Sequence, residues 1–324
     1  MGRLDRALIA WFDDVDRHEA SAAGGKGASL GDMARAGLRV PPGFVVCTAT
    51  FQKFLHSSGL DKKIANALKK LDVEDSASLE RVAQRLTRQI ESQEPAPEWH
   101  EAIVGAYRRL CAESGGTAVV AVRSSAAAED SQAASFAGQQ ETYLNVYGDE
   151  CVLRRVRACW GSFFQPRAIF YRQQRGSLVD TSIAVVVQRM VNPDKSGVMF
   201  TVDPVQRRRD RLMIEAAWGL GEAVVSGQVT PDNYVVNKSD GALISKFVPR
   251  KLVMIAREES GTGTRQVELP LDKAEAQVLS PSEIARLVEI GRKIEMHFGS
   301  PQDVEWAIEG NELYVLQSRP VTTL

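Results

Sequence analysis

The spacing of the apolar residues changes along this chain, and that change constrains its fold more than any other feature. Between residues 48 and 111, apolar side chains recur at intervals of three and four, which is typical of amphipathic helices. From residue 182 onward the apolar stretches are short and predict strands at 182–190, 196–201, 211–217, 233–237 and 243–248. The sequence therefore predicts an α+β or α/β fold with a helix-rich first lobe and a β-rich second lobe.

The same change predicts where the chain divides. We expect a helix-rich lobe over residues 1–190 and a β-rich lobe over residues 191–324, with a ligand-binding cleft between them. Further helices are expected at 26–36, 149–175 and 281–298, strands at 44–47 and 117–122, a surface loop at 257–266 and a terminal hairpin at 303–319.

Charge and composition exclude several classes of function. The chain has 324 residues with 40 Lys and Arg against 41 Asp and Glu, so no face-wide basic excess is available for nucleic acid. No apolar run approaches the roughly 20 residues of a membrane helix, and the first residues do not resemble a signal peptide. The four cysteines and four histidines are isolated, which predicts reduced thiols and no zinc site. We expect a cytoplasmic protein with no nucleic-acid or membrane partner.

A glycine pair, Gly24-Gly25, precedes Lys26 at the start of the first predicted helix. Glycines let backbone amides approach an anion, a helix N-terminus favours negative charge, and a lysine supplies a point charge for phosphate. The segment is not a P-loop, because Gly27 follows the lysine where that motif has Ser or Thr. It fits either a phosphate site or an ordinary glycine-rich helix start.

Two further segments carry polar residues next to predicted strands. Arg123 follows the buried strand 117–122, so we expect it at a strand end, where its guanidinium could bind phosphate oxygens in a forked geometry. Alternatively, a serine caps the strand end and Arg123 pairs with Glu129. Glu222 lies in a glycine loop, Trp218-Gly219-Leu220-Gly221-Glu222, whose spacing does not fit a dinucleotide-binding motif.

The terminal hairpin collects polar residues on one face. The strand period of two puts Asp303 and Glu305 on that face and Val304 and Trp306 on the other. A three-residue turn at 310–312 would place four pairs opposite each other: Asp303 and Arg319, Glu305 and Gln317, Trp306 and Leu316, and Ile308 and Tyr314. Oxygen ligands of this kind suit Mg²⁺, although an exposed hairpin face with a cross-strand ion pair would look the same.

A phosphate-binding lysine, an arginine, a glycine loop and a magnesium-type face together describe a site for a nucleoside triphosphate. Seven segments then extend the comparison over nearly the whole chain. They are GGKGASLGDM at 24–33, VPPGFVV at 40–46, AVRSSAAAEDSQAASFAGQQETYLNV at 121–146, VVVQRMV at 185–191, SGVMFTVDP at 196–204, AAWGLGEAVVSGQVTPDNYVV at 216–236 and DVEWAIEGNELYVLQSRPVT at 303–322. In this order they strongly resemble the nucleotide-binding domain of the phosphoenolpyruvate synthase (pyruvate, water dikinase) and pyruvate phosphate dikinase family.

The resemblance implies an ATP-grasp-like fold that holds Mg-ATP between two lobes, and it implies roles by position in the motifs. The residues implied to contact ATP are Lys26, Arg123, Gly138, Thr142, Gln188, Glu222, Asp303 and Arg319, and those implied to bind Mg²⁺ are Glu305 and Gln317. Of these, Lys26, Arg123 and Arg319 are implied to be catalytic at the phosphates, Gly138 and Thr142 to belong to a loop over them, and Gln188 to lie near the adenine or ribose.

The resemblance also implies a reaction. In this family a phosphoryl group, commonly the β-phosphoryl of ATP, passes to a histidine on a separate swivelling domain, leaving AMP and, in water-dependent members, inorganic phosphate. None of the four histidines here lies in a segment like the phosphohistidine motif, so we expect a partner domain or subunit to supply that histidine. The final small-molecule acceptor, such as pyruvate, phenol or an antibiotic, would bind elsewhere.

The chain fits either a separately encoded ATP-binding subunit, as in the phenylphosphate synthase branch, or an excised domain. The rifampicin phosphotransferases fuse the same ATP domain to further domains. Two other functions stay open from the sequence: an ATP-grasp ligase that forms an acyl phosphate, and a non-catalytic ATP-sensing module.

Overall fold

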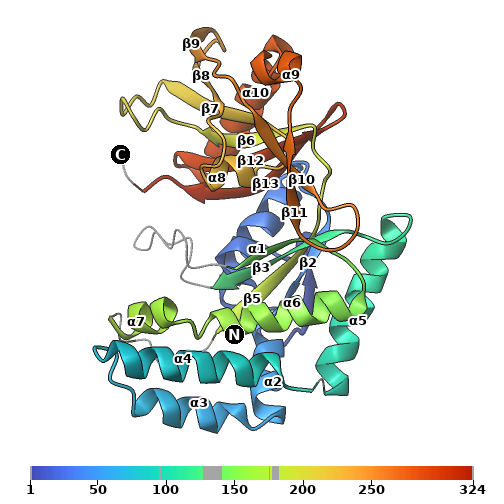
Figure 1. Ribbon diagram of the computed structural model, residues 1–324, viewed down its shortest axis with the longest axis vertical. Helices are drawn as coiled ribbons and strands as arrows, with labels where there is room; N and C mark the ends of the chain where they lie inside the picture. The colour runs from blue at the N-terminus through green and yellow to red at the C-terminus, as the bar shows by residue number, and fades with distance from the viewer. Residues whose placement is uncertain (1, 95, 127–140, 175, 177–181, 323–324) are drawn as a thin grey trace. The chain divides into compact units, whose positions relative to one another are not determined.

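The chain forms two compact units of mixed helix and sheet. A computed structural model describes residues 2–94, 96–126, 141–174, 176 and 182–322 (Figure 1). Unit 1 comprises Met1–Asp32 and Pro42–Met190, and unit 2 comprises Met33–Pro41 and Val191–Leu324. The predicted combination of α and β structure is confirmed. Among the described residues, no helix combines the length and apolar character needed to cross a bilayer.

Unit 1 is built on an antiparallel five-stranded sheet with the order β1-β2-β5-β3-β4. The strands are β1 (Ile9–Trp11), β2 (Gly43–Val46), β3 (Val120–Ala126), β4 (Thr142–Val146) and β5 (Ile183–Arg189). The helices are α1 (Ala20–Arg35), whose last residues belong to unit 2, α2 (Thr48–Ser57), α3 (Leu60–Lys69), α4 (Ser76–Glu91), α5 (Pro97–Glu113), α6 (Asp149–Ser162) and α7 (Pro166–Gln174).

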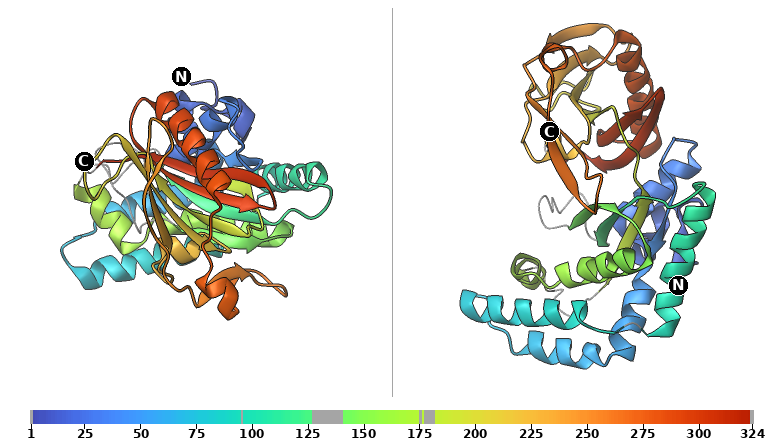
Figure 2. Two further views of the ribbon diagram at one scale, coloured as in Figure 1. Left: turned by 90° about the horizontal axis from the view of Figure 1, so that it is seen from above. Right: turned by 45° about the vertical axis from the view of Figure 1, so that its right-hand side comes forward.

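The two faces of the unit 1 sheet are covered differently. Alternate residues such as Phe44, Val122 and Val187 join the apolar cluster of α2 to α7, which lie together on one side in Figures 1 and 2. On the other face α1 approaches so closely that a Cβ on Gly27 would lie 3.0 Å from a methyl of Val45. The helical character predicted for residues 48–111 is confirmed, because α2 to α5 occupy most of this segment. The single helix expected over 149–175 is instead two helices, α6 and α7.

Unit 2 contains an antiparallel six-stranded sheet with the order β13-β12-β6-β7-β8-β9. The strands are β6 (Lys195–Phe200), β7 (Arg211–Trp218), β8 (Asp232–Asn237), β9 (Leu243–Phe247), β12 (Gln302–Glu309) and β13 (Glu312–Pro320). The helices are α8 (Glu222–Val225), α9 (Leu271–Glu275) and α10 (Pro281–Phe298), and a separate hairpin pairs β10 (Val253–Arg257) with β11 (Thr264–Glu268).

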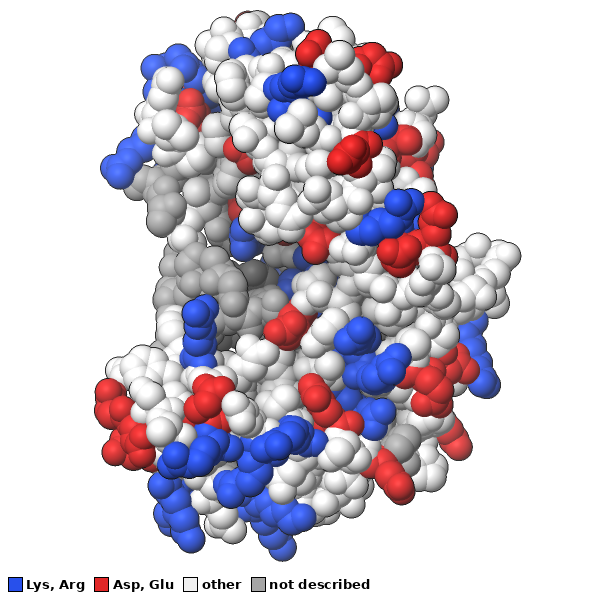
Figure 3. All heavy atoms as spheres, in the orientation of Figure 1, with Lys and Arg blue, Asp and Glu red and all other residues white. Residues whose placement is uncertain are grey.

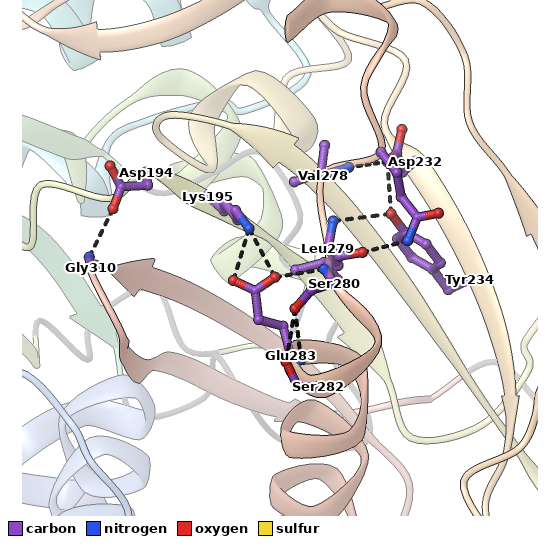
Figure 4. Close-up of polar contacts among 11 residues, drawn as sticks. Asp194, Lys195, Asp232, Tyr234, Val278, Leu279, Ser280, Ser282, Glu283 and Gly310 are labelled. Atoms are coloured by element: carbon purple, nitrogen blue, oxygen red, sulfur yellow. Dashed lines mark hydrogen bonds and ion pairs between the residues drawn. The ribbon is translucent and has the colours of Figure 1, made fainter.

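Helix α10 has the bounds that the sequence predicts and covers one face of this sheet. Ser280 and Glu283 form a capping box at its start, and Gly299, in the left-handed region with φ 70°, follows its end. Glu283 also accepts two hydrogen bonds from Lys195 Nζ, at 2.8 and 2.9 Å, which ties the helix start to β6 (Figure 4). A Cβ on Gly291 would lie 2.7 Å from a methyl of Leu212, so a larger residue would push the helix off the sheet.

The surface loop expected over 257–266 is shorter than predicted. Only residues 258–263 connect the strands, because β10 continues to Arg257 and β11 begins at Thr264. Most residues of β11 are exposed or half-buried, so the strand lacks the apolar alternation that would have indicated it in the sequence.

A buried ion pair holds the start of β8 in the unit 2 sheet. Lys251 and Asp232 pair with no exposed side-chain surface on either residue. The Asp232 carboxylate also accepts hydrogen bonds from the Val278 amide and the Tyr234 hydroxyl, each at 2.7 Å (Figure 4). The carboxylate is therefore satisfied by an ammonium group and two neutral donors from three parts of the chain.

Gly24 provides the first test of the packing. It has φ 70°, and a Cβ there would lie 2.2 Å from the carbonyl oxygen of Ser125. We expect Gly24→Ala to lower the free energy of unfolding by about 1–3 kcal/mol because its backbone, with φ 70° and ψ 166°, lies in a region essentially restricted to glycine, and by about 1–3 kcal/mol more for the clash. Gly37→Ala is the matched control, because Gly37 has φ 75° but nothing within 4 Å. Equal losses in urea unfolding of the two variants would contradict the close approach.

The buried pair provides the second test. Lys251→Met leaves the Asp232 carboxylate buried with neutral donors alone, and we expect a loss of about 3–5 kcal/mol in urea unfolding. Adding Asp232→Asn should recover part of that loss, because the uncompensated charge is then gone. Lys246→Met, on the exposed strand β9, is the control and should change stability by less than about 0.5 kcal/mol. A Lys251→Met protein as stable as the control would rule out the pair as a stabilising contact.

Candidate functional site

In unit 1, three hydrogen bonds join the start of α1 to strand β3. The Lys26 ammonium donates to the Ser124 carbonyl at 2.9 Å, and Lys26 as a whole is 4% exposed. The Gly27 amide donates to the Ser125 hydroxyl at 3.2 Å, and that hydroxyl donates to the Ala23 carbonyl at 3.0 Å. The glycine segment therefore holds Lys26 against β3.

Arg123 lies inside β3 and not at the strand end that the sequence predicts. The strand continues to Ala126 because its backbone pairs with β5 along its whole length. Arg123 is opposite Val186, and it alternates with Val122, which points into the helical core. The side chains of Arg123 and Ser125 therefore point to the α1 face. The strand continues through these polar residues beyond the end of the apolar pattern.

The other predicted residues of unit 1 are placed in part. Gln188 is 3% exposed and lies two residues after Val186 on β5, which puts it on the same sheet face as Arg123. Thr142 is exposed at the start of β4, and its backbone pairs with Arg123. Gly138 and Glu129 lie outside the described residues. Lys26, Arg123 and Gln188 are thus brought to one face of the unit 1 sheet.

In unit 2, the hairpin pairs its polar residues as predicted. Asp303 is opposite Arg319 and Glu305 is opposite Gln317. The Arg319 Nε donates to the Asp303 carboxylate at 2.8 Å. Glu305 and Gln317 therefore place a carboxylate and a side-chain amide on adjacent strands, away from the α10 face.

The outer half of the hairpin differs from the prediction. Leu316 forms a bulge, so Trp306 is opposite Val315 and Ile308 is opposite Leu313, in place of the predicted partners Leu316 and Tyr314. The turn is the two-residue Gly310-Asn311 and not a three-residue loop. The bulge puts Leu313 and Val315 into the core beside Trp306, and their burial is the physical reason for the shift.

Three carboxylates, Asp303, Glu305 and Glu215, lie on the same face of this sheet. Burial raises the pKa of Asp303, the Arg319 charge opposes that rise, and the neighbouring charge of Glu305 adds to it. Burial also raises the pKa of Glu215 on β7, with Asp303 as a second cause. Glu215 lies two strands from Glu305, with Val198 of β6 between them. The sequence did not single out Glu215, because only the strand order shows that it shares this face.

The donors on this face fit Mg²⁺. Among the described residues no three His, Cys, Asp or Glu side chains converge to hold a metal. Mg²⁺ commonly takes only one or two protein carboxylates and completes its shell with phosphate and water. Glu305 and Gln317 together supply one carboxylate and one amide oxygen, which suits a metal that arrives with a nucleotide.

Glu222 has a different environment within unit 2. It begins α8 and accepts a hydrogen bond from the Thr264 hydroxyl of β11 at 2.8 Å. The glycine loop before it is fastened to β10, because the Leu220 amide donates to the Ile255 carbonyl at 2.8 Å. Gly219, with φ 74°, lets this approach occur. The structure therefore connects Glu222 to the β10–β11 hairpin and not to another predicted site residue of unit 2.

Comparison with known proteins bears on this arrangement. The probable phosphoenolpyruvate synthase of Archaeoglobus fulgidus is 50% identical over 317 residues, which are 98% of this chain and 42% of that protein. The probable phosphoenolpyruvate synthase of Methanocaldococcus jannaschii is also 50% identical, over 98% of this chain and 27% of that protein. The rifampicin phosphotransferase of Bacillus subtilis is 40% identical over 98% of this chain and 36% of its own length.

The chain thus spans less than half the length of these relatives. A solved structure, D-alanyl-alanine synthetase A from Vibrio cholerae, aligns with 74% of the chain at 9% identity, but its TM-score of 0.30 is too low to indicate a shared fold. The family described as "Pyruvate phosphate dikinase, AMP/ATP-binding domain" matches residues 20–324. This chain therefore belongs to the family of pyruvate phosphate dikinase AMP/ATP-binding domains.

Proposed function

We propose that this chain binds Mg-ATP and transfers a phosphoryl group, the β-phosphoryl, to a histidine on a separate swivelling domain. The bond between the α- and β-phosphates would break and release AMP, and water would take the γ-phosphoryl group as inorganic phosphate. The observation that carries the proposal is the buried pair of cations, Lys26 and Arg123, on one face beside the glycine-rich start of α1. Relatives named for phosphoenolpyruvate synthesis and rifampicin phosphotransfer support phosphoryl transfer as the reaction class.

The side chains match what such a transfer requires. Phosphoryl transfer depends on positioning the reacting groups in line and on neutralising charge at the phosphate oxygens. Lys26, Arg123 and Arg319 would supply that charge from the protein. Glu305 and Gln317 would hold Mg²⁺, which neutralises further charge on the phosphates.

The remaining residues have narrower proposed roles. Gln188 would contact the adenine or ribose, and Asp303 would hold Arg319 in place beside the phosphates. Glu222 would contact ATP from the glycine loop. Gly138 and Thr142 would belong to a loop over the phosphates. An ATP-grasp-like fold and a cytoplasmic location belong to the same proposal.

In the proposed reaction, the groups that accept the phosphoryl group belong to other molecules or domains. None of His18, His56, His100 and His297 lies in a segment like the phosphohistidine motif, so a partner domain or subunit would carry the accepting histidine. That domain would pass the phosphoryl group to a small molecule such as pyruvate, phenol or an antibiotic, bound at another site.

A transfer assay tests the proposal. The chain is mixed with Mg-ATP labelled at the β-phosphate and with the part of the Archaeoglobus fulgidus relative outside the matched segment. We expect AMP and an acid-labile, base-stable label on that polypeptide. ADP formed only with an added carboxylic acid and amine would favour a ligase. Tight ATP binding without turnover would favour an ATP sensor.

Replacing the cations tests whether they take part in the transfer. We expect Lys26→Ala and Arg123→Ala each to slow transfer by about 100-fold or more, because charge stabilisation at the phosphates is lost. Urea unfolding checks that both variants stay folded. Lys63→Ala, on the exposed face of α3, is the control and should leave the rate unchanged. Normal transfer by the Lys26 and Arg123 variants would remove these residues from the proposed chemistry.

Glu305 gives a separate test of the metal site. Glu305→Ala should weaken ATP binding about tenfold in the presence of Mg²⁺, as expected for a lost bond to a charged group, and much less in EDTA. Isothermal titration calorimetry across a magnesium series measures the difference. Glu312→Ala, at the far end of the same hairpin, is the control. An unchanged magnesium dependence in Glu305→Ala would make the hairpin face structural.

A further inference from the structure

The loop between β6 and β7 is the most concentrated basic segment of unit 2. It carries Arg207, Arg208 and Arg209, followed by Asp210 and then Arg211 at the start of β7. Four arginines against one aspartate give these five residues a formal charge of +3, although the whole chain has a charge of −1. Basic side chains gather at this edge of unit 2 in Figure 3, where Figure 1 draws the β6–β7 loop.

The loop is held in a defined conformation. The Asp203 carboxylate accepts hydrogen bonds from the Val205 amide at 3.0 Å and the Gln206 amide at 2.9 Å. The backbones of Asp203 and Arg208 bond to each other in both directions at 3.0 Å. Arg207 at the tip has φ 54°, a left-handed conformation that arginine rarely adopts. The tip therefore presents its side chains from a fixed turn.

The four arginines are not equivalent. Arg208 makes two hydrogen bonds to Asp210, at 2.9 and 2.8 Å, and Arg211 donates to the Gln206 side chain at 2.9 Å. Within the described part of the chain, Arg207 and Arg209 have no such partner, and both are exposed. Val205 beside them is 80% exposed. The loop thus offers two uncompensated cations and one apolar side chain to solvent.

The loop starts at the end of the sheet that carries the proposed phosphate arginine. Phe200, the last residue of β6, is opposite Asp303, which pairs in turn with Arg319. The Thr201 amide then donates to the Gln302 carbonyl at 2.8 Å, which fixes where the loop leaves the sheet. A polypeptide that brings a histidine to the phosphate end of unit 2 would meet this loop.

We propose that the loop 205–211 docks an acidic surface of the polypeptide that carries the phosphoryl-accepting histidine. This inference rests on the proposed function for the existence of that polypeptide. Exposed charges at the rim of an interface chiefly raise the association rate and select the partner, which suits a domain that must arrive and leave in each cycle. One loop of charge +3 is too small to hold a nucleic acid, which needs many phosphate contacts.

The test compares two matched pairs of substitutions in the full chain. Arg207→Asn with Arg209→Asn removes the two exposed cations, and asparagine tolerates the left-handed backbone of residue 207. Arg81→Gln with Arg85→Gln removes two exposed arginines from α4 of unit 1 as the control. The probe is fluorescent poly-L-glutamate, titrated at several salt concentrations, with inorganic polyphosphate as a second probe.

We expect the loop variant to bind poly-L-glutamate about tenfold more weakly than the original chain at low salt. The control should bind within about twofold of it, and the differences should disappear near 1 M salt, where charges are screened within about 3 Å. No binding by the original chain, or equal losses in the two variants, would overturn the proposal. So would polyphosphate binding that is as tight and equally sensitive to the loop, because the loop would then be a general anion site.

Two further measurements keep this inference separate from the proposed function. ATP affinity, measured by calorimetry, should be the same in the loop variant and the original chain. In the transfer assay, the loop variant should raise the KM for the histidine-bearing polypeptide about tenfold and leave the KM for ATP unchanged. An absence of transfer by every protein would reject the proposed function, whereas the poly-L-glutamate titration would still decide the docking role. An increased KM for ATP alone would overturn the docking role.

Discussion

The close approach of α1 to β3 at Gly24 is the contact that arranges the candidate site residues of unit 1. A Cβ at this position would lie 2.2 Å from both the carbonyl and the hydroxyl oxygen of Ser125, so the contact requires a residue without a side chain. The approach lets the Ser125 hydroxyl bond to Ala23 and Gly27, and it places the Lys26 ammonium on the Ser124 carbonyl. Two cations that are almost 100 residues apart in the chain are brought to one sheet face because one side chain is absent.

The candidate site residues of unit 2 are arranged by the alternation of a single sheet. One face is buried under α10, and the other carries Asp303 and Glu305, so apolar packing and polar chemistry are separated by one residue of register. The bulge at Leu316 follows from this constraint. It shifts the outer pairs by one residue so that Leu313 and Val315 are buried, while Glu305 stays opposite Gln317. The core thus adjusts without moving the proposed metal ligands.

Local signals predicted much of the fold. The bounds of α10 follow from a capping box at Ser280 and a glycine at 299, both of which act within a few residues. The polar pairs of the hairpin were predicted with a three-residue turn, and they hold because the bulged Leu316 adds the residue that the two-residue turn lacks. Non-local contacts account for what the sequence missed. Pairing with β5 extends β3 beyond Arg123, and only the strand order puts Glu215 next to Val198, on the face that carries Glu305. Sequence periodicity shows which face a residue occupies but not which strand lies next to it.

The net charge of the chain and the charge of one loop must also be distinguished. A net charge of −1 argues against a basic excess over a whole face of the protein, but it does not describe the charge of a single loop. At physiological ionic strength exposed charges act over about 8 Å, so the surplus acidic residues elsewhere do not cancel Arg207 and Arg209 at the β6–β7 tip. What matters there is that Asp210 engages Arg208 and leaves its two neighbours unmatched. A nearly neutral chain can therefore carry a strongly charged contact point, provided that the fold separates a few cations from their balancing carboxylates.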